Sequence, residues 1–201
     1  MYFDFRKYVI AALLTALVWI MALTPLGYIP LFGVDVTLMC IPVIVGTCAL
    51  GLQYGLFLGF MFALTSLFMA LMGRAGVLLS PLLNFPLAMY PTIFVPRLLI
   101  PIVTWLVYKT TKKLNVLLSY GLSALVGSFV NTLFFLSFAY ILGANPLTEI
   151  YQISSRELLS SLGAIAKSNG LLEAAVSVIV CVPVLDILKR TFNNHGEALE
   201  H

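Results

Sequence analysis

Residues 36–73 read VTLMCIPVIVGTCALGLQYGLFLGFMFALTSLFMALMG and contain no Asp, Glu, Lys or Arg. A charge-free apolar segment of about 20 residues is long enough to cross the ~30 Å hydrocarbon core of a bilayer as a helix. This stretch has room for two such helices, joined by a very short turn at residues 51–55. Three further charge-free runs, 8–34, 75–96 and 114–148, predict that most of the chain lies in lipid.

The composition agrees with a membrane protein. The chain is 61% hydrophobic and 9% charged, with a mean hydropathy of +1.06, which lies far outside the range of soluble domains. Its 201 residues accommodate about six spans with short connections. We therefore predict an all-α membrane protein whose six transmembrane helices form one compact bundle over residues 1–192. Residues 193–201 are interpreted as a tail that carries the remnant of a purification tag.

The expected spans are bounded by breaks in the apolar pattern. They lie near 7–25, 37–53, 55–73, 91–110, 115–142 and 166–190. Residues 74–90 are expected to form a loop or re-entrant segment, and residues 143–165 an extramembrane loop with a short amphipathic helix. In the second span Pro42 should bend or delay the helix, because proline lacks a backbone donor, and Asp35 is expected to cap it. Gly55 and Gly59 form a small-xxx-small pair that allows close helix approach.

Basic residues are concentrated at one end of these spans. One side carries Arg6, Lys7, Lys109, Lys112, Lys113, Lys189 and Arg190. The other side carries only Arg74, Arg156 and Lys167. The richer side is expected to be cytoplasmic, so both termini lie inside and the three long loops face outside. This asymmetry favours a protein of the cell membrane that captures a molecule from the exterior.

The residues needed for common enzymatic chemistry are missing from the sequence. The two histidines, His195 and His201, lie in the tail, and no Gly-Lys dipeptide, H-E-x-x-H or G-x-S-x-G pattern occurs. Cys40, Cys48 and Cys181 lie inside apolar runs and are interpreted as small buried hydrophobic residues. We expect no catalytic residue, metal or cofactor in this chain. The absence of a basic patch interleaved with aromatic residues excludes nucleic acid as a partner.

Four polar residues are predicted to lie at one depth in the outer half of the membrane. Arg97 precedes Lys109 by 12 residues, which places it about 18 Å above the cytoplasmic cluster. Asn131, Asn169 and Glu173 fall at similar depths on their own helices. Charged and polar residues in a span are expensive and are functional candidates by default, so these four are predicted to bind substrate.

Structural explanations for the same residues remain open. In the first explanation, Arg97 and Glu173 form a salt bridge with each other. In the second, Arg97 faces lipid and extends its charged end toward the membrane surface. Asn131 alternatively makes an interhelical hydrogen bond. Tyr90 and Asn84 are included among the substrate-binding candidates, although Tyr90, like Tyr28 and Tyr140, also suits an interfacial aromatic belt. Asp186 is expected to pair with Lys189 or Arg190 at the inner end.

The order of several short motifs resembles one family. The motifs are ALLTA at 12–16, IPVIVG at 41–46, GLQYGLFLG at 51–59, VPR at 95–97 and GSFVNT at 127–132. With the six-span layout, they resemble the substrate-binding S-components of energy-coupling factor (ECF) vitamin transporters. The resemblance covers nearly the whole chain apart from the outer loops and the tail, and residues 74–90 match no pattern of the family.

The resemblance implies a function and a set of partners. Such proteins bind a vitamin from outside, beneath the first outer loop, and dock on a transmembrane coupling subunit through small residues on the first helix, here Ala12 and Ala16. They then topple to release the ligand, with ATP hydrolysed by two cytoplasmic ATPase subunits. The group most similar to this chain includes pantothenate carriers, and a buried Arg suits a carboxylate, so pantothenate is the first expectation.

Other ligands and one other class of protein stay open. Pyridoxine or a related pyrimidine, riboflavin and cobalamin are all compatible with a pocket that holds one or two charges. A membrane channel or a scaffold is the alternative class. A channel is expected to show polar residues through the whole membrane thickness, whereas the inner halves of these spans are nearly all apolar.

Overall fold

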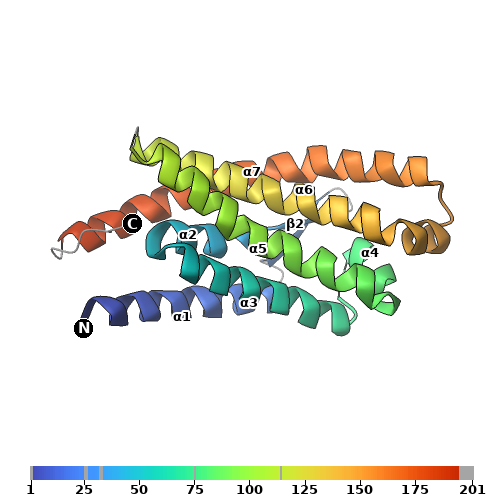
Figure 1. Ribbon diagram of the computed structural model, residues 1–201, viewed down its shortest axis with the longest axis horizontal. Helices are drawn as coiled ribbons and strands as arrows, with labels where there is room; N and C mark the ends of the chain where they lie inside the picture. The colour runs from blue at the N-terminus through green and yellow to red at the C-terminus, as the bar shows by residue number, and fades with distance from the viewer. Residues whose placement is uncertain (1, 25–26, 32–33, 75, 114, 195–201) are drawn as a thin grey trace.

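Six helices run along the long axis of the molecule (Figure 1). The computed structural model describes residues 2–24, 27–31, 34–74, 76–113 and 115–194. The six helices are α1 (Tyr2–Leu23), α2 (Cys40–Leu50), α3 (Leu52–Leu71), α5 (Pro86–Thr111), α6 (Val116–Tyr151) and α7 (Ser155–Asn194). Five of them are long and apolar enough to cross a membrane, and α2 is a shorter apolar helix. The predicted six-helix membrane fold is confirmed.

Helix α2 is shorter than the predicted span of 37–53. Its 11 residues reach about 16 Å, roughly half of the hydrocarbon thickness. Pro42 lies in its first turn, where a missing N–H donor costs nothing, so the proline delays the helix and does not bend it. The helix ends at Gly51, whose φ of 97° is unfavourable for any residue with a Cβ. The chain turns there directly into α3.

The first outer connection contains a β-hairpin that the sequence analysis did not predict. Strand β1 (Tyr28–Leu31) pairs antiparallel with β2 (Val34–Thr37), and Tyr28 lies opposite Thr37. The prediction that Asp35 caps α2 is wrong, because Asp35 lies inside β2 opposite Pro30 and the N-cap residue of α2 is Met39. The side chains of Tyr28 and Asp35 lie outside the described part of the structure.

Residues 74–90 contain short helices. After α3 the chain forms α4 (Gly76–Leu79) and the 3₁₀ helix η2 (Ser80–Asn84), and α5 begins at Pro86. Proline at the first position of a helix has the required φ and loses no hydrogen bond. The segment therefore returns to the bundle as a folded cover on its outer end.

The predicted outer loop at 143–165 is helical instead. Helix α6 continues to Tyr151, Gln152 adopts a left-handed φ of 53°, and α7 begins at Ser155. At 36 residues, α6 is about 54 Å long and extends beyond the ~30 Å hydrocarbon core. Gly143 allows η2 to pack on this extension, since a Cβ built there lies 3.1 Å from Leu82. Pro146 lies inside this extension of α6 and is buried.

Close packing between helices depends on small residues in α3 and α6. A Cβ built on Gly59 lies 2.6 Å from the backbone oxygen of Arg97 in α5. One built on Gly55 overlaps Thr47 in α2, and one on Gly127 overlaps Thr104 in α5. The predicted close approach at Gly55 and Gly59 is confirmed, and it fixes α5 against α3 at the level of Arg97.

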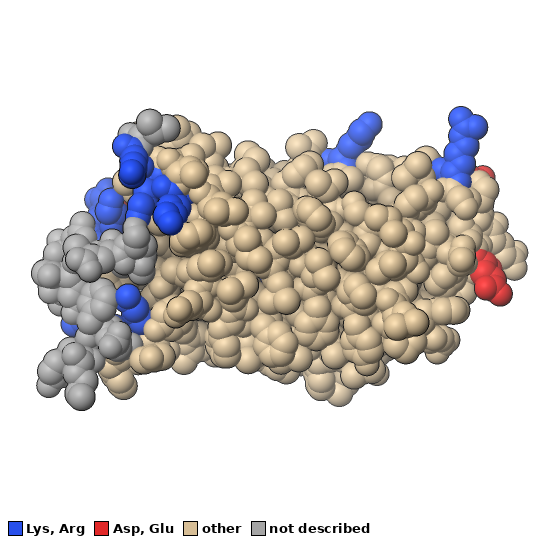
Figure 2. All heavy atoms as spheres, viewed as in Figure 1, with Lys and Arg blue, Asp and Glu red and all other residues tan. Residues whose placement is uncertain are grey.

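The first residues of α1 and the last of α7 lie at the same end of the molecule, where Lys and Arg gather (Figures 1 and 2). At this end Arg190 Nη2 lies 2.8 Å from Asp186 Oδ2, so the predicted pair is confirmed with Arg190. Cys40, Cys48 and Cys181 are buried and free, as expected. That the basic end faces the cytoplasm stays a prediction from the charge distribution.

Candidate functional site

Four of the predicted site residues are buried together in the outer half of the bundle. Arg97 comes from α5, Asn131 from α6, and Asn169 and Glu173 from α7. Their exposed fractions are 6%, 4%, 4% and 4%. Buried charges and amides are costly unless they are paired or used, so their contacts decide what this cluster does.

The guanidinium of Arg97 lies between two aromatic rings. Its Cζ is 5.2 Å from the ring centre of Phe62 in α3 and 4.6 Å from that of Phe135 in α6. Its Nη1 donates a 3.2 Å hydrogen bond to the carbonyl of Thr92. Helical side chains point toward the N-terminus of their helix, which for α5 is the outer end. The protein therefore holds a positive charge among apolar groups and directs it away from the basic end of the molecule.

Glu173 joins three elements of the structure. Its Oε1 accepts a 2.6 Å hydrogen bond from the backbone N–H of Thr37 at the end of β2. Its Oε2 accepts one of 2.6 Å from the hydroxyl of Thr132 in α6. Arg97 is near enough to attract the carboxylate electrostatically. Glu173 is thus the point at which the outer hairpin is fastened to the helices.

Three buried polar atoms beside Glu173 have no hydrogen-bond partner among the described residues. They are Asn131 Oδ1, Asn169 Nδ2 and Thr37 Oγ1. An unsatisfied buried donor or acceptor costs about 1–3 kcal/mol. The interhelical hydrogen bond considered for Asn131 is not made by its oxygen within the described part of the chain. Together the three atoms present two acceptors and two donors to the same region.

Neighbouring side chains on α6 and α7 link the four residues. Asn131 and Phe135 are four residues apart on α6, which is about 6 Å, and Phe135 contacts Arg97. Thr132, next to Asn131, binds Glu173, and Asn169 is one turn from Glu173 on α7. These links agree with the predicted common depth, and a shared substrate site stays a prediction.

A smaller polar group lies between this cluster and the basic end of the molecule. Cys40 Sγ, at the start of α2, is 3.8 Å from Ser128 Oγ and 3.6 Å from Ser177 Oγ. All three residues are fully buried. Ser128 and Ser177 lie one turn deeper than Thr132 and Glu173 on α6 and α7. Below them the hydrophobic core contains residues such as Ile44 and Ile100, with the buried hydroxyl side chains of Thr47, Thr104 and Ser123 at the same end.

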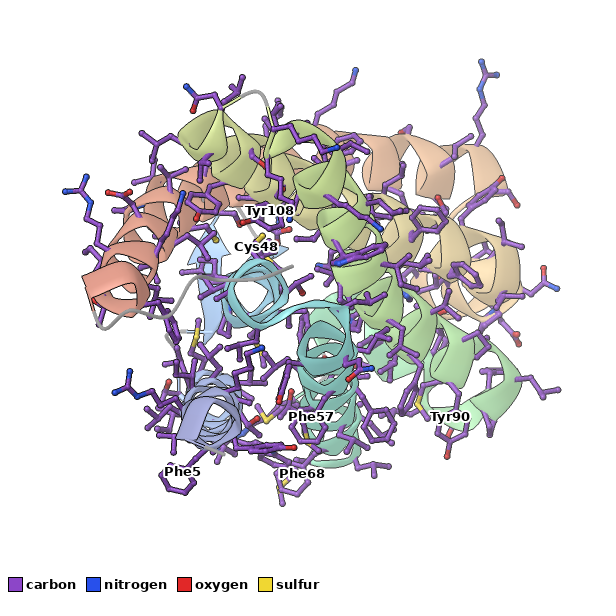
Figure 3. The ribbon with its side chains drawn as sticks, turned by 60° about the vertical axis from the view of Figure 1, so that its left-hand side comes forward. Phe5, Cys48, Phe57, Phe68, Tyr90 and Tyr108 are labelled. Carbon is purple, nitrogen blue, oxygen red and sulfur yellow. The ribbon has the colours of Figure 1, made fainter. Side chains whose placement is uncertain are left out.

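Two further candidates are placed away from the buried cluster. Tyr90 is 47% exposed, and it projects from α5 at the edge of the molecule (Figure 3). Asn84 is exposed at the end of η2. The structure does not bring them to Arg97, and their role in binding substrate stays a prediction.

The sequence analysis missed several residues of the site. Phe62 and Phe135 enclose the guanidinium, but aromatic residues are so common in these spans that no pattern distinguishes them. Thr37 was missed because the hairpin was not predicted. Thr132 and Ser128 do lie in the GSFVNT motif at 127–132, and their helical spacing relative to Asn131 was the available signal.

Ala12 and Ala16 lie on an exposed face of α1, opposite the buried Ala11 and Val18. Both alanines are exposed, next to the exposed Leu13 and Leu17 on the same helix. The geometry is compatible with the predicted docking role, which stays a prediction.

Comparison with known proteins identifies the family. The family model described as "ECF transporter, substrate-specific component" matches residues 6–185. The chain belongs to this family. The match spans all six helices and includes Arg97, Asn131, Asn169 and Glu173. The S-component family is one of transporter substrate-binding proteins of the membrane, not of enzymes.

A curated relative of this S-component is the pantothenic acid transporter PanT of Lactococcus lactis subsp. cremoris (strain MG1363). The two sequences are 30% identical over 172 residues, which cover 81% of this chain and 82% of the relative. The S-component described here is therefore a membrane protein homologous, over most of its length, to a vitamin transporter.

Proposed function

We propose that this S-component binds pantothenate from the outside of the cell and that Arg97 recognises its carboxylate. The observation that carries the proposal is the buried guanidinium of Arg97, together with the buried Asn131 and Asn169, whose Oδ1 and Nδ2 atoms respectively lack partners among the described residues. The name of the relative, a pantothenic acid transporter, supports the same ligand.

The chemistry of pantothenate suits this set of groups. Its carboxylate matches the fork of a guanidinium, and its hydroxyls and amide offer donors to Asn131 Oδ1 and acceptors to Asn169 Nδ2. The aromatic rings of Phe62 and Phe135 exclude water around Arg97, which strengthens a charge interaction relative to one in solvent. One ligand thus satisfies groups whose burial is otherwise unfavourable.

The β-hairpin is proposed to close the pocket. Its last residue, Thr37, is held by Glu173, while the side chains of α4 and η2 cover the outer end from the other direction. Opening of the hairpin is proposed to break the hydrogen bond between the backbone N–H of Thr37 and Glu173.

Delivery to the cytoplasm requires partners. We propose that the face of α1 around Ala12 and Ala16 docks on a transmembrane coupling subunit, because small residues permit close helix contact in lipid. Two cytoplasmic ATPase subunits supply the energy, and the S-component topples to release its ligand. No cofactor is required in this chain.

The experiment is to purify the full chain in detergent, identify any co-purified small molecule by mass spectrometry, and titrate the emptied protein with vitamins. Pantothenate is expected to bind with a dissociation constant below 1 µM, which is about −8 kcal/mol. Tight binding of pyridoxine, a pyrimidine, riboflavin or cobalamin, with none of pantothenate, would replace the proposed ligand. The absence of binding by every vitamin would refute the transport function itself.

A further inference from the structure

A cavity of about 500 Å³ lies at the basic end of the bundle, far from Arg97 along the long axis. It is formed by the first turns of α1, the turn between α2 and α3, and the last turns of α5. Lys7, Lys109 and Lys112 line it together with Tyr8, Tyr54 and Trp105. This cavity is separate from the proposed vitamin site, and the transport function does not explain it.

The lining of the cavity is cationic. The described residues that line it include three lysines and neither Asp nor Glu. Two of the ammonium groups are positioned by aromatic rings, since Lys109 Nζ lies 4.5 Å from the ring centre of Trp105 and Lys112 Nζ lies 5.7 Å from that of Tyr108. These contacts retain both positive charges beside the cavity, so its ligand is an anion.

The rings of the lining form a wall at the depth of the membrane interface. Tyr8 and Tyr54 meet edge to face at 6.0 Å, and Tyr108, labelled in Figure 3, stacks on Tyr120 at 5.8 Å. Tyr and Trp characteristically lie at the level of lipid headgroups. The anion that reaches this wall is therefore at the height of a phospholipid phosphate.

Apolar surface next to the cavity distinguishes a lipid from a free anion. Leu106 on α5, one residue from Trp105, is 48% exposed. Leu106 precedes Lys109 and Lys112 on α5, so it lies on the hydrocarbon side of both lysines. An acyl chain attached to the bound phosphate covers this exposed apolar surface, whereas inorganic phosphate leaves it uncovered.

We propose that this cavity is a specific site for an anionic phospholipid of the inner leaflet, with its phosphate between Lys109, Lys112 and Lys7. Basic pockets between membrane helices on the cytoplasmic side are suited to such headgroups. Because the site includes α1, it ties the bound lipid to the helix that carries Ala12 and Ala16.

The test is native mass spectrometry of the full chain, titrated in neutral detergent with phosphatidylglycerol, phosphatidylcholine or inorganic phosphate. The variant is K109Q/K112Q. The matched control is K113Q/K189Q, which removes two lysines at the same end that do not line the cavity. We expect phosphatidylglycerol to bind at least tenfold more tightly than phosphatidylcholine, and K109Q/K112Q to lose at least tenfold (about 1.4 kcal/mol) while the control keeps its affinity.

Equal losses in the two double variants would show diffuse attraction and overturn the site. Retention of phosphate as tightly as phosphatidylglycerol would overturn the lipid. A second measurement needs no lysine variant: in W19F, the emission of Trp105 is expected to be quenched more by brominated phosphatidylglycerol than by brominated phosphatidylcholine, and equal quenching contradicts the proposal. Vitamin binding is measured separately, so its failure is distinguishable from the failure of this site.

Discussion

The carboxylate of Glu173 in α7 holds the backbone N–H of Thr37 at 2.6 Å, so a helix residue fixes the end of the outer hairpin. The other carboxylate oxygen holds Thr132 at the same distance. One side chain thereby sets the position of β2 relative to α6 and α7. Glu173 therefore couples the hairpin, which covers the site, to α6 and α7, which form its walls.

Replacing Glu173 separates its hydrogen bonds from its charge. E173A leaves two buried donors unpaired and is expected to destabilise the protein by about 1–3 kcal/mol, measured as thermal unfolding in detergent. E173Q retains an acceptor for Thr37 and a donor for the hydroxyl of Thr132, so it is expected to lose less than half as much. If E173Q unfolds as early as E173A, the charge and not the hydrogen bonding stabilises the hairpin.

The two asparagines are expected to show a trade-off between stability and binding. N131L and N169L each remove a buried polar atom that lacks a partner among the described residues. The empty protein should therefore melt at the same or a higher temperature, while its affinity for pantothenate falls at least tenfold. Lower melting temperatures with unchanged affinity would assign both residues to the structure and not to the site.

Helix packing beneath Arg97 is tested at Gly59. A methyl group there lies 2.6 Å from the backbone oxygen of Arg97, so G59A should force α3 and α5 apart and cost about 1–3 kcal/mol. The matched control is G163A in α7, where a Cβ has no neighbour within 4 Å, and it should stabilise by about 0.5–1 kcal/mol. Thermal unfolding of the two variants side by side gives the comparison; similar effects would contradict close packing at Gly59.

The role of α1 is tested by separating binding from uptake. A12L/A16L should keep wild-type affinity for the vitamin, because both residues lie on an exposed face away from the buried cluster. Uptake by cells that carry the coupling module should fall to background, as bulky residues prevent close helix contact. I141W, at an exposed position on α6, serves as the control with normal uptake. Unimpaired uptake in A12L/A16L would refute docking through this face.

The number of helices, their basic end and the depth of the buried polar residues were predictable because they depend on the chain's own sequence. Charge-free runs set the spans, and a rise of about 1.5 Å per residue placed Arg97 and Asn131 at one level. These properties are local, and lipid leaves few alternatives to a helix.

The outer end of the molecule was predicted poorly because tertiary packing decides it. Asp35 has the chemistry of a helix cap, yet the pairing of β1 with β2 takes its residue into a strand. Gly143 and Pro146 are typical of a loop, yet α6 continues through both, and Leu82 packs against it at Gly143. The aromatic rings around Arg97 were likewise unpredictable, since only the assembled bundle selects Phe62 and Phe135 from the many phenylalanines.

Recognition of a carboxylate by Arg97 is tested most directly by a cycle of two proteins and two ligands. Wild type and R97A are each titrated with pantothenate and with pantothenol, in which an alcohol replaces the carboxylate. R97A should weaken pantothenate at least tenfold, about 1.4 kcal/mol, and leave pantothenol within about twofold. Equal losses for both ligands, or no loss for either, would contradict the account.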